Sequence, residues 1–549
     1  MKKTEKDPIN SHWLDKLILP LFPQVKLEHL LVALILILAV VSRFYILGER
    51  VMSHDEVNHV VPSYDLYQGR GYSHDPVTHG PMQFHLLAAS YFLFGDTDFS
   101  SRIPSALFSI ATIAFVLFAW RRYLGRTGAL LAGFFFLISP FLLFYGRYTR
   151  NESFIGLFTV ILLYAVLQYM ERGKPRTLYL YTIVLSLYFC TKETSFIFAA
   201  EMLIFLAIFF IREISQYEWK QSSQRDLFIL LVIIGLLLVG VTLGAAILRA
   251  RPGMEVAAAT GEGIGNFLTP ALLTTIELVS VALAGLVLIA AIYFLLKGFG
   301  WQQIRSIRSF DLLLLTFTLI LPQLIAFPIS WLGWNPLDYS QEGLIRTSIV
   351  MLISVIISLG IGLIWKPMIW LKNAAIFYAI FIVLYTTIFT NGQGFFTGLV
   401  GSLGYWLSQQ SVNRGTQPWY YYSVIQIQMY EYLAAWGTLM AFLLAIRHRL
   451  FSLIPNVSPL EQVALEAKRK AAEEKSSDDA QDIEQIQHEE IAENLIVQPA
   501  ERNFFIPGVD PVKVPTVVLL IYWAIMSLLA YTAAGEKMPW LTVHIAIPM

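Results

Sequence analysis

Charged residues and cysteine are scarce in this chain of 549 residues. Only 14% of the residues are charged, against roughly 25% in a typical soluble domain, so a soluble fold is excluded. The formal net charge is zero, so we expect no nucleic-acid partner. Cys190 is the only cysteine, which excludes an intramolecular disulfide and a thiolate metal cluster. No glycine-rich nucleotide fingerprint follows a candidate strand, so we expect no soluble nucleotide-sugar site.

Long apolar runs dominate what is present, because 56% of the residues are hydrophobic. A spanning helix needs about 20 mostly apolar residues. The pattern therefore predicts an all-α polytopic membrane protein with about 13 transmembrane helices. The first run is too long for the core of a cleaved signal peptide, so it is interpreted as a retained helix. The helices are expected near residues 29–48, 103–120, 127–145, 153–170, 177–192, 195–211, 227–248, 271–296, 311–331, 344–365, 374–390, 430–446 and 514–533.

Basic residues in short loops predict the orientation, since such loops are enriched on the cytoplasmic side. All of them fall on one side if the N-terminus lies on that side too. The prediction is a multi-pass protein of the cell membrane, with its N-terminus inside and its active site outside. Arg147 and Arg150 are exceptions, because they would lie outside. The loops carry Arg121, Arg122, Arg126, Arg172, Lys174, Arg176, Arg305, Arg308, Lys366, Lys372, Arg447 and Arg449.

Composition divides the chain into four predicted segments. Residues 1–28 form a cytoplasmic N-terminus, in which residues 12–24 are expected to form an amphipathic helix on the membrane surface. Residues 29–455 form the main bundle. Residues 456–512 are charged throughout and start a helix at a capping box, which predicts a cytoplasmic helical linker. Residues 513–549 form a final transmembrane helix and an outer segment; the chain either ends there or is a fragment of something longer.

The first outer loop, residues 49–101, holds the densest cluster of reactive side chains, including five of the ten histidines. A carboxylate beside a substrate hydroxyl can act as a general base, so Asp55 and Glu56 are candidate catalytic residues. Their adjacent side chains should point in different directions, so only one should face the reaction. The same acids could instead bind a divalent metal such as Mg or Mn, with His54, His59, His79 and Glu152 as supporting residues or possible ligands. A solvated loop with incidental histidines is the third interpretation.

Two arginines follow the third predicted span, in the segment Arg147-Tyr148-Thr149-Arg150-Asn151-Glu152. Arginine suits bidentate recognition of phosphate. The alternative is a salt bridge to Glu152 or a contact with a lipid headgroup. Lys192 lies at the same predicted depth and could either pair with Glu193 or contact the same phosphate. The four cations expected to bind a lipid phosphate are Arg102, Arg147, Arg150 and Lys192.

Aromatic residues gather in the predicted outer loop 391–429. Trp419 and Tyr420 could stack on a sugar ring. The equally simple alternative is an aromatic belt at the membrane interface.

Several short motifs occur in an order that resembles the GT-C superfamily of lipid-phosphate-sugar-dependent glycosyltransferases. Within it, the chain is most similar to the dolichyl-phosphate-mannose protein mannosyltransferase group, and especially to the flippase-activity-associated family. The resemblance covers mainly residues 30–215, with two further similar runs at 417–422 and 535–541. The motifs are Asp55-Glu56, His79-Gly80-Pro81, Arg102-x-Pro104-Ser105 and Ser139-Pro140…Arg147…Glu152.

The resemblance implies a many-helix fold whose first outer loop is catalytic and contains juxtamembrane helices. It also implies a sugar donor carried on a polyprenyl phosphate and inversion at the anomeric carbon. Asp55 matches the family's catalytic acid, and Arg102 and Arg147 fall in motifs that keep a basic residue. Residues 82–84 depart from the lysine-containing pattern of the protein mannosyltransferases, so the phosphate contacts are expected to differ.

The predicted function is inverting transfer of a sugar from a polyprenyl-phosphate donor to a glycan, lipid or protein acceptor at the outer face of the bilayer. One alternative is a non-catalytic accessory protein of a lipid-linked oligosaccharide flippase, which would not need a base at Asp55. A secondary transporter is a weaker alternative, because such proteins place coupling charges near the membrane midplane. The sequence identifies neither the sugar nor the acceptor.

Overall fold

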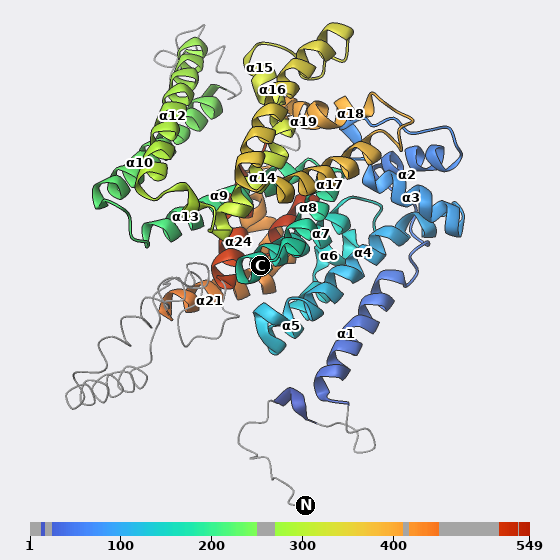
Figure 1. Ribbon diagram of the computed structural model, residues 1–549. Coiled ribbons are helices and arrows are strands. Elements are labelled where there is room, and N and C mark those ends of the chain that lie inside the picture. The colour runs from blue at the N-terminus through green and yellow to red at the C-terminus, as the bar shows by residue number, and fades with distance from the viewer. Residues whose placement is uncertain (1–12, 17–24, 250–268, 410–416, 449–514, 536) are drawn as a thin grey trace, which may run out of the picture.

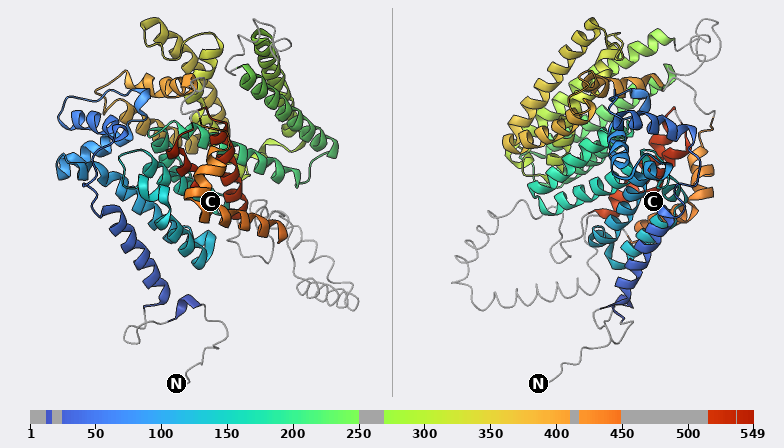
Figure 2. Two further views of the ribbon diagram at one scale, coloured as in Figure 1. Left: turned by 180° about the vertical axis from the view of Figure 1, so that it is seen from behind. Right: turned by 90° about the vertical axis from the view of Figure 1, so that its right-hand side faces the viewer.

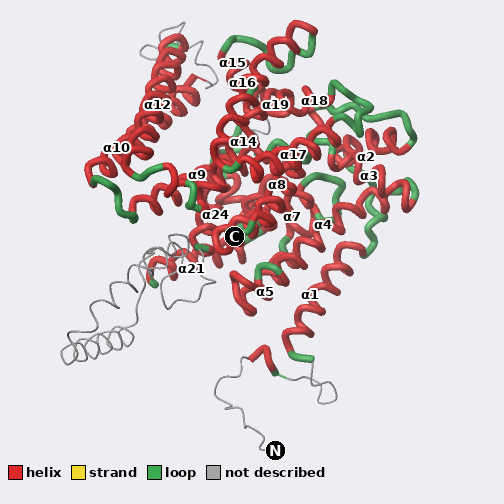
Figure 3. The backbone as a smooth tube through the Cα atoms, viewed as in Figure 1, coloured by secondary structure: helices red, strands yellow, loops and turns green. Residues whose placement is uncertain are grey.

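The computed structural model describes residues 13–16, 25–249, 269–409, 417–448, 515–535 and 537–549 (Figure 1). Over these ranges the chain consists of helices and loops and contains no strand (Figure 3). Nine helices in the described part are long and apolar enough to cross a membrane, or ten if one bent pair counts as a single span. The all-α polytopic membrane fold predicted from the sequence is thus confirmed. The predicted linker 456–512 and most of the predicted surface helix 12–24 lie outside the described residues.

The main bundle is formed by helices that alternate in direction along the chain. The first loop inserts two shorter helices, α2 (His54–Tyr67) and α3 (Met82–Phe94), with the 3-10 turn η3 (Pro76–Thr78) between them. The long helices are α1 (Leu27–Phe44), α4 (Asp98–Phe118), α5 (Arg121–Ile138), α7 (Glu152–Arg172), α8 (Pro175–Phe189), α9 (Thr194–Ser215), α10 (Ser222–Arg249), α12 (Pro270–Gly298), α14 (Arg308–Ile320), α16 (Gln341–Trp365), α17 (Pro367–Tyr385), α21 (Tyr432–Arg447) and α24 (Thr516–Ala533). The short ones are η2 (Trp13–Asp15), α6 (Pro140–Tyr145), α13 (Trp301–Ile304), η5 (Leu321–Leu324), α15 (Ala326–Trp331), α18 (Gly394–Phe396), η6 (Thr397–Gly401), α19 (Ser402–Gln409), η7 (Tyr421–Gln426), α20 (Ile427–Tyr430), η8 (Pro539–Leu541) and α25 (Thr542–Ala546).

Four of the thirteen predicted spans lie on shorter or broken helices. The predicted span 430–446 lies on α21, which has only 16 residues and is bent by 110° from the helix before it. The predicted span 127–145 is divided at Ser139-Pro140, where α5 ends and α6 begins, because proline cannot continue a helix without breaking its hydrogen bonds. The predicted span 311–331 is divided by η5, which contains Pro322. α8 has only 15 residues, or about 22 Å at 1.5 Å per residue, which is less than the hydrocarbon thickness of a bilayer.

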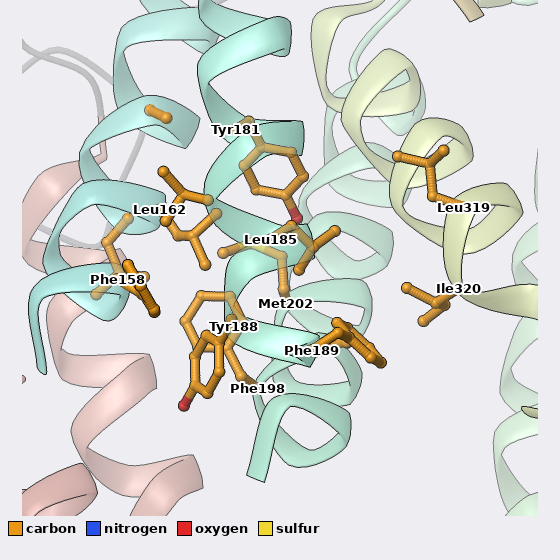
Figure 4. Packing of buried hydrophobic residues seen from close by; sticks show 14 of the residues in the cluster. Phe158, Leu162, Tyr181, Leu185, Tyr188, Phe189, Phe198, Met202, Leu319 and Ile320 are labelled. Carbon is orange, nitrogen blue, oxygen red and sulfur yellow. The ribbon is translucent and has the colours of Figure 1, made fainter. Parts of the chain in front are cut away.

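The largest apolar core lies where α7, α8 and α9 pack against α14 and α17. Figure 4 shows Phe158 and Leu162 of α7 facing Leu185 and Tyr188 of α8, with Met202 of α9 close by. α7 is buried over most of its length, so it is the central helix of the bundle. Its first turn carries Glu152, and this rigid packing fixes the position of that residue.

The two ends of the bundle differ in their charged contacts. At one end, Arg121 and Arg126 after α4 pair with Glu28 at the start of α1, and Arg126 also pairs with Asp15 of η2. The described N-terminal residues therefore lie at the end that carries the basic loops. α2 and α3 lie at the opposite end, which we call the first-loop end.

α10 and α12 form a hairpin that stands apart from the rest of the bundle in Figure 1 and in the left panel of Figure 2. The two helices pack mainly on each other, and few of their residues are buried. Arg249 pairs with Glu277 at one end of the hairpin, and the Thr242 and Ser280 hydroxyls hydrogen-bond at 2.7 Å. The hairpin contacts the bundle through an apolar cluster around Phe210, at the end of α9.

Candidate functional site

α2 separates the two adjacent acids of the first loop. Ser53 caps the helix, because its hydroxyl accepts the Glu56 N–H and the Glu56 carboxylate accepts the Ser53 N–H at 3.1 Å. Successive residues of a helix are rotated by about 100°, so Asp55 and Glu56 diverge as the sequence analysis predicted. Glu56 is fully buried, whereas the Asp55 side chain is 41% exposed and lines a cavity.

Glu56 is the centre of a buried hydrogen-bond cluster. Arg102 of α4 donates to both carboxylate oxygens at 2.8 and 3.0 Å, Arg50 donates at 2.9 Å, and the Thr149 N–H donates at 3.1 Å. Burial opposes ionisation of Glu56, but these donors outweigh it and lower the pKa of the carboxyl. Arg102 also donates to the Leu47 and Arg50 carbonyls, so its guanidinium is satisfied inside the protein. We therefore predict that Glu56 and Arg102 stabilise the first loop and do not contact the substrate.

Replacing Glu56 with Gln is expected to destabilise the protein. The amide keeps the shape but leaves the buried Arg102 guanidinium without its counter-charge, a loss of about 3–5 kcal/mol. The melting temperature of the purified variant in detergent should fall clearly below that of the wild type. Glu49→Gln is the matched control, because Glu49 is exposed and its side chain makes no hydrogen bond within the described part of the chain. Equal melting temperatures for Glu56→Gln and wild type would rule out this structural role.

A second charged cluster connects Asp55 to the start of α7. Arg150 is buried and donates to Asp55 at 2.7 Å, and its Nε lies 3.3 Å from Glu152. Lys192, also buried, donates to the same Glu152 at 2.5 Å. The Arg150 guanidinium lies 3.7 Å from the ring centroid of Trp540, a cation–π contact from the opposite end of the sequence. Two carboxylates and two cations thus form a row, with Asp55 at its exposed end.

The histidines of the first loop separate into buried and exposed members. His79 pairs with Glu193 at 2.6 Å, and its ring stacks on His59 at 6.4 Å between centroids. Burial, reinforced by the nearby His79, lowers the pKa of His59 well below its usual range, so His59 is neutral. His54 lies exposed at the start of α2, and its side chain makes no hydrogen bond to the described residues. Gly80 fixes this segment against the 190–192 turn, where a Cβ atom would collide with the Cys190 carbonyl.

Asp55 lines a cavity of about 480 Å³ at the first-loop end. Its walls are mostly aromatic, from α6, α20 and η8. A second, apolar groove of about 390 Å³ runs along α5, α7, α21, α24 and residues 546–549, and shares Pro140 and Tyr430 with the cavity. Glu431 lies at the 110° bend between α20 and α21 and accepts a hydrogen bond from the Ser139 hydroxyl at 2.6 Å. This bond links α21 to the start of α6, beside the residues that the cavity and the groove share. The cavity is lined by Asp55, Pro140, Phe141, Phe144, Tyr145, Tyr148, Gln426, Tyr430, Pro539 and Trp540.

Several buried polar atoms near this cluster make no hydrogen bond within the described part of the chain. They include both side-chain polar atoms of Asn151, one oxygen of Glu152 and Nε2 of His544. Buried polar groups are rarely left without a partner, so such atoms indicate a place where water or a ligand completes the structure.

The structure groups some of the predicted residues and separates others. Asp55, Arg150, Glu152 and Lys192 lie together, and His59 and His79 lie together. Arg147 lies elsewhere, where it donates to the Ser42 and Tyr45 carbonyls at the end of α1 at 2.6 and 2.8 Å.

The two aromatic residues proposed for sugar stacking do not line the cavity. Trp419 is 73% exposed, and it contacts its neighbour Tyr420 edge-on. Trp540 is the aromatic residue that enters the charged cluster, although no role is predicted for it from the sequence. The one sequence signal for Trp540 is that it lies in the run 535–541, which is similar to a run in the flippase-activity-associated family.

The residues around Asp55 do not fit a resident divalent metal. In the part of the chain that the structure describes, no three His, Cys, Asp or Glu side chains are grouped as metal ligands. The Asp55 carboxylate is already paired with Arg150, and His59 is packed against Phe84.

Comparison with known families gives one match, over residues 78–247, to the model described as dolichyl-phosphate-mannose-protein mannosyltransferase. The resemblance indicated by the motifs is confirmed. This mannosyltransferase-like segment includes α3 to α9, and thus Arg102, Arg150, Glu152 and Lys192. It does not include Asp55. No curated protein matches the chain.

Three solved structures are similar at low identity. One is the oligosaccharyltransferase of Archaeoglobus fulgidus in complex with Zn and sulfate, with 13% identity, a TM-score of 0.30, and coverage of 70% of this chain and 51% of that one. The chain therefore spans about half of that protein. The others are ArnT from Cupriavidus metallidurans bound to undecaprenyl phosphate (16%, 0.29, covering 70% and 79%) and in the apo state (16%, 0.28, covering 72% and 78%).

Proposed function

We propose that this protein transfers a sugar from a polyprenyl-phosphate donor to an acceptor hydroxyl, with inversion at the anomeric carbon. The observation that carries the proposal is the position of Asp55: a partly exposed carboxylate in a cavity that adjoins an apolar groove, paired with a buried arginine. The match of residues 78–247 to a mannosyltransferase family supports the sugar-transfer chemistry. The groove would hold the polyprenyl tail and the cavity the sugar.

Arg150 and Lys192 are the cations proposed to hold the donor phosphate. Both are buried and both contact Glu152, which fixes their positions without cancelling both charges. Trp540 stacks on the Arg150 guanidinium and holds its plane, so the fork can donate two parallel hydrogen bonds. An incoming phosphate would replace Asp55 as the partner of Arg150, and this exchange would release the Asp55 carboxylate.

The released carboxylate is the proposed general base. As the acceptor oxygen bonds to the anomeric carbon, Asp55 takes the hydroxyl proton, and the bond between that carbon and the phosphate oxygen breaks. The electron pair of that bond leaves with the polyprenyl phosphate. One negative charge therefore moves from Asp55 to the leaving phosphate, which Arg150 contacts. A preformed cation at the point where charge develops stabilises the transition state.

The deciding experiment uses purified protein with labelled polyprenyl-phosphate sugars and a panel of glycan, lipid and protein acceptors. Transfer of label to an acceptor, with inverted linkage, is the expected result. If the protein binds polyprenyl phosphate but transfers no sugar from any donor, the flippase-accessory alternative replaces the enzyme.

The site is proposed to face the outside of the cell, because the basic loops and the N-terminal residues lie at the other end of the bundle. The single native cysteine, Cys190, is buried, so an impermeant maleimide will report only on introduced cysteines. We expect Asp96→Cys to be labelled in intact cells, and Lys174→Cys only after permeabilisation. Both positions are exposed and at opposite ends. The reverse pattern would place the site inside.

A further inference from the structure

A group of arginines near the end of α1 lacks enough negative charge to balance it. Arg43 is buried and donates to the Ser109 hydroxyl and to the Phe136 and Leu137 carbonyls, none of which is charged. Arg147 donates to two further carbonyls.

Among the described residues, Glu56 is the carboxylate that forms ion pairs with this group of arginines. Arg50 shares Glu56 with Arg102, and the adjacent Glu49 makes no ion pair within the described residues. Burial, and to a smaller extent the charges of Arg50 and Arg102, lower the pKa of Arg147, as expected where like charges lie close together. An anion at this place would relieve the repulsion.

Arg50 and Arg147 are the accessible members. The Arg50 side chain is 44% exposed and lies over the rings of Tyr148 and Phe144, at 4.8 and 5.5 Å from their centroids. Arg147 is half-buried and uses one N–H of each terminal nitrogen, so most of its five donors are unused.

Exposed apolar side chains flank the two arginines. Tyr45 and Ile46, which follow α1, are more than half exposed, and Phe144 of α6 is about half exposed. A cationic pair beside apolar surface suits an amphiphile whose anionic headgroup and hydrocarbon chain bind together. A free inorganic anion would gain nothing from the apolar part.

We propose that Arg50 and Arg147 form a second phosphate site, which binds the phosphate of a bilayer lipid on the outside of α1 and α6. It is separate from the Arg150–Lys192 pair, whose cations are buried and paired with Asp55 and Glu152. Tyr148 connects the proposed lipid site to the cavity, because the Arg50 guanidinium lies over its ring and the same residue lines the cavity beside Asp55. A lipid bound here would lie next to the cavity mouth, and its recognition does not depend on sugar transfer.

The test measures lipid binding by delipidated protein in detergent. Dioleoyl phosphatidic acid should raise the melting temperature of the wild type, whereas dioleoyl phosphatidylcholine and inorganic phosphate at the same concentration should not. In Arg147→Gln the apparent affinity for phosphatidic acid should fall roughly ten- to hundredfold. Native mass spectrometry should then count one fewer bound phosphatidic acid molecule.

Arg70→Gln is the matched control, since Arg70 is an exposed arginine of the first loop that pairs with Asp65. It should bind lipid like the wild type. Arg50→Gln provides a second variant if Arg147→Gln does not fold, with the same expected loss. Unchanged phosphatidic acid binding in whichever variant folds would overturn the site. An equal response to inorganic phosphate would overturn the lipid assignment.

Discussion

Asp55→Asn is expected to abolish sugar transfer while leaving donor binding intact. The amide has the same shape but cannot accept the hydroxyl proton, so kcat should fall by about 10²–10⁴-fold. Donor affinity should not weaken, because Asp55 competes with the phosphate for Arg150 in the proposed exchange. The measurement is single-turnover transfer of labelled sugar, together with a separate binding titration of the donor.

Asp65→Asn is the matched control for this variant. Asp65 lies on the same helix and also pairs with an arginine, Arg70, at 2.7 Å, but it does not line the cavity. Its transfer rate should equal that of the wild type. Treatment with a chelator tests the metal alternative. If a chelator abolishes activity and Mg²⁺ or Mn²⁺ restores it, the reaction requires a metal. Full activity in Asp55→Asn would refute the assignment of the base.

Arg150→Gln is expected to weaken donor binding and slow transfer together. The variant removes a charge-assisted hydrogen bond to the phosphate, a contribution of about 1.5–3 kcal/mol, or roughly ten- to hundredfold in Kd. It also removes the cation proposed to stabilise the negative charge on the leaving phosphate, so transfer slows. Arg150→Lys should recover part of the affinity, because lysine keeps the charge but lacks the planar fork.

The control for Arg150 is Arg126→Gln, which removes a guanidinium from an ion pair at the opposite end of the bundle. Donor Kd should be unchanged there. A contrary pattern is also informative. If Arg147→Gln weakens donor binding and Arg150→Gln does not, the donor phosphate binds beside α1 and the two proposed phosphate sites must be exchanged.

Most of the correct predictions came from the lengths of the apolar runs and from the geometry of the α-helix. The apolar runs located the bundle, and the rotation between neighbours on a helix predicted that Asp55 and Glu56 diverge. The length of an apolar run did not distinguish a full span from the 15-residue α8. It also did not reveal the break at Ser139-Pro140, because one or two residues change the hydropathy of a long run very little.

Long-range pairing is what the sequence could not supply. Arg147 and Arg150 are three residues apart and chemically equivalent, yet one contacts α1 and the other contacts Asp55. The sequence also offered Glu193 as a partner for Lys192, whereas Lys192 pairs with Glu152 and Glu193 pairs with His79. These choices depend on how helices pack, which no local pattern encodes.

The contact between Trp540 and Arg150 can form only late in the synthesis of the chain. Trp540 is translated about 390 residues after Arg150, or roughly 20 to 80 s later at ordinary ribosome speeds. During that interval the earlier helices are in the translocon or the bilayer, with Arg150 lacking its aromatic partner and the cavity lacking one wall. The nascent chain therefore passes through a stage at which the mannosyltransferase-like segment has been made and the site is still open. Any factor that protects buried charges in unfinished membrane proteins would act on this chain before α24 has been inserted.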